Sequence, residues 1–295
     1  MGKSARAQNA RLVELRAQQA KAERRSKLMI AGATVGVVAI VVIALVIAAL
    51  QGGTDVTGQS STALDQATFA KVTSVPAASL DTVGAGASDN PPKTIDAPAL
   101  TKDGKPRVLY VGAEYCPYCA TERWPLVVAL SRFGTWNNLS ASFSAPAPEV
   151  NPNTATVSFH GATYSSQYVS FTGYETSTNK QTNGQWGKLD TLEGEDLALF
   201  QKFNAPPYVQ SSGAIPWINL GGTSIQAGAS YNSAVILNKT QAEIATALAD
   251  PTTDIAKGVN GAANVLTAQI CKSTNQQPTA VCTAPGVVAA AAKLQ

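Results

Sequence analysis

The chain has 295 residues, a length that allows one or two domains. Apolar residues make up 45% of it and charged residues 14%, which excludes a charge-rich disordered chain. The net charge of +3 is too small for nucleic acid to be the main partner. A single histidine, His160, argues against a His-based catalytic triad or a His-rich metal site.

The N-terminal part of the chain carries its own charge pattern. Residues 1–27 hold eight basic and two acidic side chains, whereas residues 28–50 hold none. As a helix the apolar run is about 35 Å long, and it exceeds the roughly 30 Å of a bilayer core and the apolar core of a cleaved signal peptide. We therefore expect an uncleaved transmembrane helix at 28–50, with the basic segment 1–27 in the cytoplasm.

This topology predicts a single-pass plasma-membrane protein whose residues 51–295 lie outside the cytoplasm, where disulfides persist. Residues 51–75 are small and polar, and they predict a tether with a little helix near 63–70. Residues 76–106 are rich in Pro and Gly and predict a turn-rich segment with an edge strand near 94–100.

The segment from 107 to 134 gives the sharpest signal. Residues 107–113, RVLYVGA, are apolar and β-prone, and they predict a buried strand. Cys116-Pro117-Tyr118-Cys119 follows at once, and the apolar spacing after it predicts a helix that ends at Gly134 and is kinked at Pro125.

The rest of the chain predicts alternating strands and helices. Residues 140–190 form a Ser/Thr/aromatic-rich β segment, with strands at 154–161 and 163–175 and a loop at 177–188. A helix is expected at 192–203, strands at 213–220 and 223–228, and helices at 240–249 and 253–272. The tail from 285 to 295 is expected to be frayed.

Cys116 and Cys119 sit at a strand-to-helix junction. Unpaired N–H groups at a helix N-terminus favour a thiolate, so Cys116 is the candidate nucleophile and Cys119, one turn on, the resolving thiol. A zinc half-site would need a second short ligand pair that the sequence lacks, and an inert disulfide is the other alternative. The context favours thiol redox chemistry with no metal and no bound cofactor.

The remaining candidate residues have other expected roles. Cys271 and Cys282 flank ten residues and predict a structural disulfide that pins the last long helix, with a second redox pair as the alternative. Tyr115, Tyr118 and Trp124 are expected to pack or to face a substrate. His160 is expected to be an ordinary surface or strand histidine.

A strand, CPYC, a helix with an interior proline and a later Ile215-Pro216 that opens a β-hairpin together resemble the thioredoxin fold. The resemblance implies an α/β thioredoxin-like domain at 76–284 with an inserted β segment. It also implies a cis-Pro216 that faces the CxxC and, with Ile215, holds substrate backbone. The Pro-Tyr dipeptide resembles that of glutaredoxins.

Longer motifs resemble a more specific family. GAEYCPYCATERWPLVVALSRFG, FHGATYSSQYVSFTGYE, GAIPWINLGG and GAANVLTAQICKSTNQQPTAVC resemble the bacterial domain-of-unknown-function family 929 across nearly all of 76–283. That family is membrane-anchored and thioredoxin-like. Pro125 and the WINLGG strand depart from its usual pattern, and neither departure touches the cysteines.

Together these patterns predict a membrane-tethered thiol–disulfide oxidoreductase that acts on cysteines of exported proteins and works with a membrane redox partner. The alternative is a cell-envelope binding or assembly module in which the 116–119 pair is a permanent disulfide.

Overall fold

Strand β4 (Lys105–Gly112) lies at the centre of the largest sheet in the computed structural model, which describes residues 55–294. Parallel β9 (Ser170–Glu175) pairs with it, and antiparallel β12 (Trp217–Leu220) pairs with it too. Antiparallel β13 (Ser224–Ala227) and the short β2 (Lys93–Thr94) continue the sheet beyond β12. The protein is thus a mixed α/β structure, as expected.

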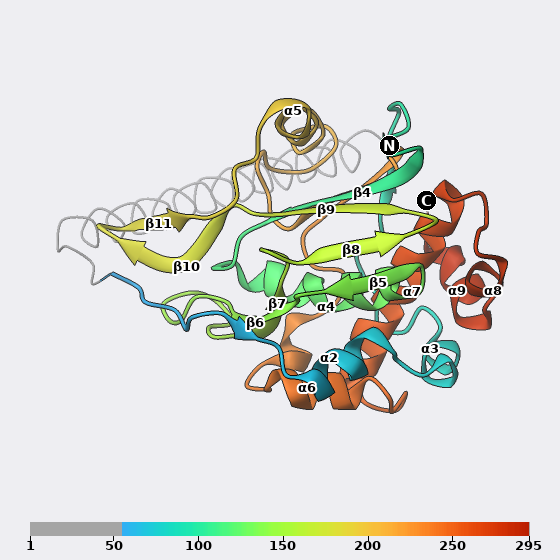
Figure 1. Ribbon diagram of the computed structural model, residues 1–295, viewed down its shortest axis with the longest axis horizontal. Helices are drawn as coiled ribbons and strands as arrows, with labels where there is room; N and C mark the ends of the chain where they lie inside the picture. Colours follow the sequence, from blue (N-terminus) through green and yellow to red (C-terminus); the bar gives the residue numbers. More distant parts are fainter. Residues whose placement is uncertain (1–54, 295) are drawn as a thin grey trace, which may run out of the picture. The chain divides into compact units, whose positions relative to one another are not determined.

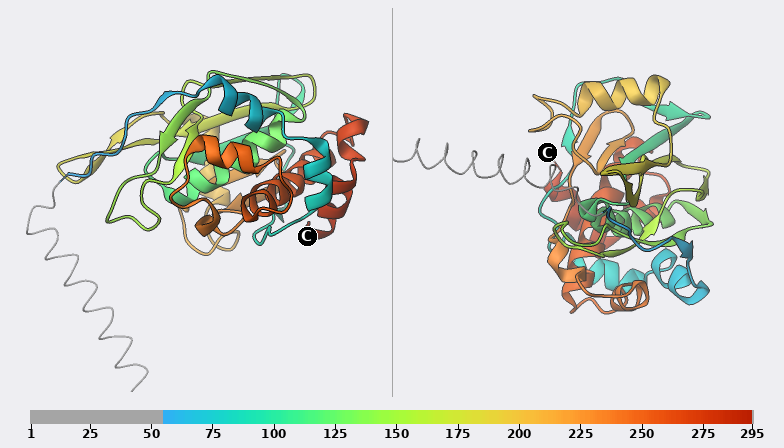
Figure 2. Two further views of the ribbon diagram at one scale, coloured as in Figure 1. Left: turned by 90° about the horizontal axis from the view of Figure 1, so that it is seen from below. Right: turned by 90° about the vertical axis from the view of Figure 1, so that its left-hand side faces the viewer.

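Both faces of this sheet are covered, which explains why β4 is apolar without interruption. Val108 and Tyr110 point into one hydrophobic cluster, and Leu109 and Val111 point into the other. Helices α4 (Pro117–Ser131) and α7 (Asp254–Ser273) cover the first face, and α5 (Gly194–Phe203) covers the second. Figures 1 and 2 show α5 on the opposite side of the sheet from these two helices.

Smaller sheets extend the structure beside the central one, in the orders β1-β6-β7, β5-β8 and β10-β11. The short β3 (Thr101–Lys102) pairs with the start of β4 and completes the central sheet. The strands outside the central sheet are β1 (Thr62–Ala63), β5 (Gly134–Asn137), β6 (Ser140–Phe143), β7 (Ala155–Ser158), β8 (Thr163–Ser166), β10 (Ser177–Thr182) and β11 (Gln185–Lys188). The remaining helices are α2 (Gln66–Thr73), α3 (Ala77–Val83), α6 (Gln241–Ala247), α8 (Thr279–Cys282) and α9 (Pro285–Ala290), with 3-10 turns η1 (Ser233–Ile236) and η2 (Ala291–Lys293).

The predicted cytoplasmic segment 1–27 and transmembrane helix 28–50 lie outside the described residues. Within residues 55–294, none of the helices combines the length and the apolar composition that crossing a bilayer requires.

The predicted tether and the predicted frayed tail were wrong where the structure describes them. Residues 55–75 belong to the compact unit, because Asp65 caps α2 by accepting a hydrogen bond from the Thr68 N–H and Val72 is buried. At the other end, the helix α9 buries Val287 and lies beside α3 and α7 (Figure 2). Short stretches of small residues were enough for helices once a neighbouring surface covered them.

The β segment also differs from expectation in two places. The loop expected at 177–188 is the β10–β11 hairpin, whose turn residues Asn183 and Gly184 both have positive φ, as a tight hairpin turn requires. The single strand expected at 163–175 is two strands, because Ser166 Oγ accepts hydrogen bonds from the N–H groups of Tyr168 and Val169 and bends the chain. The edge strand expected at 94–100 is reduced to β2 and β3.

Candidate functional site

The CPYC segment lies between the end of β4 and the start of α4. Cys116 is the N-cap residue of α4, with extended backbone, and its Sγ accepts a hydrogen bond from the Cys119 N–H at 3.2 Å. Pro117 occupies the first helical turn, where no N–H is needed. The short loop after Gly112 therefore places the Cys116 sulfur at the N-terminus of α4.

Both cysteines are free thiols, and both are buried. Cys116 is 5% exposed and Cys119 is fully buried, so Cys116 is the sulfur on the solvent side. Burial opposes ionisation of Cys116, but hydrogen bonds from the Cys119 side chain and backbone and the positive charge of Arg123 outweigh it. The pKa of Cys116 therefore lies below the ordinary thiol value.

The Cys119 thiol behaves in the opposite way. Its burial, and its hydrogen bond to Cys116, raise its pKa well above the ordinary value. The pair thus separates into one thiol that ionises readily and one that keeps its proton, which is the division that nucleophile and resolving thiol need.

Ile215 and Pro216 lie directly across from Cys116. The Cys116 thiol donates to the Ile215 carbonyl oxygen, with 3.7 Å between Sγ and O. The peptide bond between Ile215 and Pro216 is cis, and β12 begins at the next residue. The Pro216 carbonyl accepts a hydrogen bond from the Gly228 N–H at 2.8 Å, which joins this segment to the end of β13.

The two tyrosines expected to face a substrate have different surroundings. Tyr115 is stacked on Trp186 of β11, with ring centroids 4.6 Å apart and planes 6° apart. Tyr118 is 45% exposed and lines a hollow of about 520 Å³. Trp124, fully buried and bonded through its indole N–H to the Ala155 carbonyl, is a packing residue.

Two hollows that share Gly228 lie near the CPYC segment and Ile215. The first is the one beside Tyr118, which Asn151 and Asn232 also line. The second, about 410 Å³, is lined by Tyr208, Ala214 and Ala227 among others, and Ala214 directly precedes Ile215.

Four buried polar residues near the cysteines were not predicted from the sequence. Arg123 and Glu175 form a fully buried ion pair, Tyr110 is fully buried nearby, and Glu122 is buried one turn after Cys119. The sequence signal was the pair Glu122-Arg123 inside an otherwise apolar helix. Glu122 accepts hydrogen bonds from Gln226 and from the backbone and hydroxyl of Ser230, and its burial raises its pKa to about 7.

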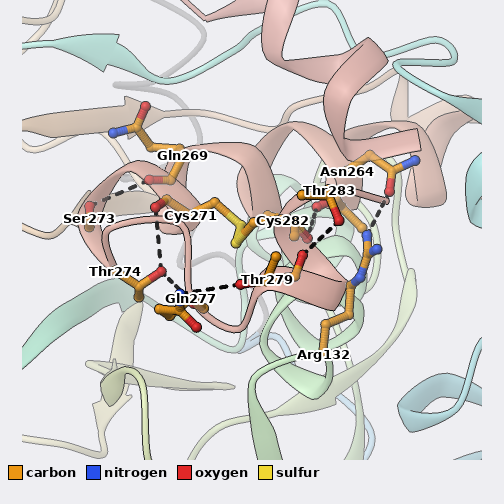
Figure 3. The surroundings of a disulfide bond; sticks show 12 residues. Arg132, Asn264, Gln269, Cys271, Ser273, Thr274, Gln277, Thr279, Cys282 and Thr283 are labelled. Carbon is orange, nitrogen blue, oxygen red and sulfur yellow. Dashed lines mark hydrogen bonds between the residues drawn. A yellow bond between two sulfur atoms is a disulfide. The ribbon is translucent and has the colours of Figure 1, made fainter. Parts of the chain in front are cut away.

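Cys271 and Cys282 are joined by a disulfide, which ties the end of α7 to α8 (Figure 3). Their Cα atoms are 5.6 Å apart. Thr274 donates to the Gln277 carbonyl, and Gln277 donates to the Thr279 hydroxyl, so side-chain hydrogen bonds close the intervening loop. The geometry supports a structural role for this bridge.

His160 is exposed, and its Nδ1 lies 2.7 Å from a carboxylate oxygen of Asp190. Across the described range 55–294, no three or more His, Cys, Asp and Glu side chains converge in a way that could hold a metal ion.

Comparisons with known proteins identify a family but no characterised relative. Residues 92–191 match the family described as Domain of unknown function (DUF929), a shorter stretch than the 76–283 over which the motifs predicted the resemblance. No curated protein and no solved structure matches the chain. The matched residues 92–191 include β4, the CPYC segment and α4, so this part of the chain is similar to the DUF929 family.

Proposed function

We propose that the protein is a thiol–disulfide oxidoreductase that exchanges disulfides with cysteines of exported proteins through Cys116 and Cys119. The observation that carries this proposal is the arrangement around Cys116. Its sulfur lies at a helix N-terminus, its pKa is lowered, a backbone carbonyl of Ile215 lies 3.7 Å away, and a second thiol lies one turn behind.

The strand order supports a thioredoxin-like core for this chemistry. From β4 the chain enters α4, returns in the parallel strand β9, and then adds antiparallel β12 and β13 before α7. A strand, a CxxC helix, a parallel strand and a closing hairpin and helix are the elements that the resemblance implies, with β5–β8 and β10–β11 as additions to them.

The exchange reaction balances without a bound cofactor. In the oxidised state, a substrate thiolate attacks the Cys116 sulfur, the 116–119 bond breaks, and Cys119 leaves as a thiolate. A second substrate thiolate then attacks the mixed disulfide, a substrate disulfide forms, and Cys116 leaves as a thiolate. Two electrons pass from substrate to protein, and the reverse sequence reduces a substrate disulfide.

The surroundings of Cys116 support polypeptide substrates. The Ile215 carbonyl lies next to the sulfur, and the two hollows that share Gly228 are lined by the neighbouring residues Ala214 and Tyr118. Exposed Tyr118 offers an apolar surface at one of them.

The proposal includes a location and a partner. The predicted anchor 28–50 would hold the domain at the outer face of the plasma membrane, where exported proteins form disulfides. A membrane redox partner would restore the pair after each cycle. It would accept two electrons from the cysteines after a substrate is oxidised, or donate two electrons to them after a substrate is reduced.

The test is the reduction potential of the 116–119 pair in the purified full-length protein, equilibrated with glutathione buffers. We expect a potential between about −120 and −270 mV. We also expect Cys116 to alkylate with a pKa below about 7.5. A Cys119→Ser variant should accumulate mixed disulfides with substrate, and a Cys116→Ser variant, its matched control, should accumulate none.

The burial of both thiols is the observation on which the alternative rests, a binding or assembly module with a permanent disulfide. A potential below about −300 mV, together with an unreactive Cys116, would favour that alternative and refute the enzyme.

A further inference from the structure

A buried polar cluster lies directly beneath the CPYC loop. Arg123 donates from Nε and Nη2 to the two carboxylate oxygens of Glu175, at 2.8 and 2.6 Å. Its Nη2 also donates to the carbonyl of Ala113, which precedes Cys116 by three residues. The side chains of Arg123 and Glu175 have no exposed surface, so this guanidinium is fixed in place under the loop.

Two hydrogen-bond donors of this cluster have no acceptor among the residues that the structure describes. Arg123 Nη1 and the Tyr110 hydroxyl are both buried, and neither makes a hydrogen bond to any residue of the part that the structure describes. A buried donor without a partner lowers stability, and such groups in a native protein call for an explanation.

Both donors belong to side chains that interact electrostatically with Cys119. Arg123 follows Cys119 by four residues on α4, which puts the two side chains on one face of the helix. The Tyr110 hydroxyl lies so close to Gly112 that a Cβ there would collide with it. Arg123 lowers the pKa of Cys119, and Cys119 in turn acts on the ionisation of Tyr110.

The exchange reaction produces a charge at this place. When a thiolate attacks the Cys116 sulfur of the disulfide, the electrons of the broken bond remain on the Cys119 sulfur. That sulfur is fully buried and cannot be stabilised by bulk water. Since a better-stabilised thiolate leaves faster, donors aimed at this sulfur would accelerate the step.

We propose that the Tyr110 hydroxyl and Arg123 Nη1 hold the Cys119 thiolate that forms transiently during disulfide exchange, with Glu175 fixing the guanidinium in position. This inference rests on the proposed function, because it assigns a role within the same reaction.

The proposal has a specific kinetic consequence. In the fully reduced protein Cys119 keeps its proton, and in the fully oxidised protein it is in the disulfide, so the thiolate exists only in between. Removing a donor should therefore slow attack on the disulfide and slow resolution of the mixed disulfide, while the equilibrium between the two end states stays the same.

The test compares two Tyr→Phe variants of the full-length protein, with reduced glutathione as the attacking thiol. Tyr110→Phe should slow both steps by about three- to tenfold, because a hydrogen bond to a charged sulfur is lost and only part of it is felt in the rate. Its equilibrium constant with glutathione should change less than twofold. Its unfolding midpoint should stay the same or rise, because the lost hydroxyl has no protein partner.

Tyr164→Phe is the matched control. Tyr164 is partly buried, and its hydroxyl donates to the Leu130 carbonyl at 2.8 Å, near the end of α4 that is about 20 Å from Cys116. This variant should unfold more easily and exchange with glutathione at the wild-type rate.

The possible results distinguish a failure of the proposed oxidoreductase function from a failure of the proposed role of Tyr110 and Arg123. If glutathione fails to open the 116–119 disulfide of the wild-type protein, the proposed function fails. If the wild-type protein exchanges and Tyr110→Phe exchanges equally fast in both steps, the role of the cluster is refuted and the function stands. If Tyr110→Phe exchanged more slowly but its equilibrium constant with glutathione changed by the same factor, the role of the cluster would also be refuted. The substitution would then act on the fully oxidised or fully reduced protein and not on the transient thiolate.

Discussion

The ionisation of one buried side chain, Glu122, should make the unfolding free energy of the whole fold depend on pH. Its buried carboxyl holds Gln226 and Ser230 through three hydrogen bonds, and burial raises its pKa from about 4.5 to about 7. Between these two values the folded protein binds a proton that the unfolded chain has released. Stability therefore falls as pH rises through this window.

We expect Glu122→Gln to remove this dependence. Between pH 5 and pH 8 the wild-type protein should lose roughly 2–3 kcal/mol more unfolding free energy than the variant, because a tenfold change in an ionisation constant corresponds to about 1.4 kcal/mol. Urea unfolding at the two pH values measures this difference.

Glu243→Gln is the control for that experiment. Glu243 is exposed in the capping box of α6, and hydrogen bonds with Thr240 lower its pKa, so it stays ionised from pH 5 to pH 8. Its substitution should leave the pH dependence as in the wild type. Equal losses in the wild type and in Glu122→Gln would show that Glu122 does not titrate in this window.

The candidate residues were predictable to different degrees for a physical reason. Cys116 and Cys119 are three positions apart, so local spacing and the strand-to-helix context reveal them. Pro216 and Ile215 came only from the resemblance. Arg123 stands out in the sequence as a charge in an apolar helix, but its role does not, because that role depends on Glu175, which is 52 residues away and reaches it through the pairing of β4 and β9.

At the scale of elements, the bridge between Cys271 and Cys282 holds the end of α7 against α8. Replacing both cysteines with alanine removes the closed loop and so raises the conformational entropy of the unfolded chain. We therefore expect the unfolding free energy to fall by about 3 kcal/mol. Thermal or urea unfolding of the double variant measures it.

The reactivity of Cys116 serves as the internal control for that variant, because the bridge takes no part in the proposed exchange. Cys116 should alkylate at the wild-type rate. An unchanged unfolding free energy would contradict the structural role of the bridge, and reduced exchange activity at full stability would revive the second redox pair as an alternative.

Elements were predictable where burial leaves an apolar pattern in the sequence. The predicted strand 107–113 matches β4 closely, because both faces of β4 are buried and its apolar run is continuous. The predicted helix 253–272 matches α7, whose buried residues follow a helical spacing. The β10–β11 hairpin lacks such a pattern, because apart from one bridge between Thr57 and Lys180 its strands pair with each other and keep many polar side chains at the surface. Its Asn183-Gly184 turn is the signal that could identify it.

At the scale of the molecule, alternation of strands and helices was enough to predict a mixed α/β protein. The division of the strands among one central and several small sheets was not predictable in this way, because β1 pairs with β6, which is distant in the sequence, and no local pattern encodes that contact. The same contact is why residues 55–75 belong to the compact unit and do not form a tether.

The redox state of the CPYC pair should change how the stability of the whole molecule depends on pH. In the reduced protein the pKa of Cys116 is lower than in the unfolded chain. Its contribution to stability is therefore complete above the ordinary thiol pKa, about 8.5, and is lost as pH falls through the folded value. Cys119 has a raised pKa and lowers stability only above about 8.5.

In the oxidised protein neither Cys116 nor Cys119 titrates, whereas Glu122 changes the unfolding free energy of both forms equally. The unfolding free energy of the reduced protein should therefore rise relative to that of the oxidised protein as pH increases from 6 to 8. Urea unfolding of the two forms at both pH values tests this. Cys116→Ser, which cannot form the 116–119 disulfide, is the control for the reduced form, and its stability should lack the rise that Cys116 causes. A constant difference in the wild type would mean that the fold does not stabilise the Cys116 thiolate, and the proposed exchange reaction would lose its nucleophile.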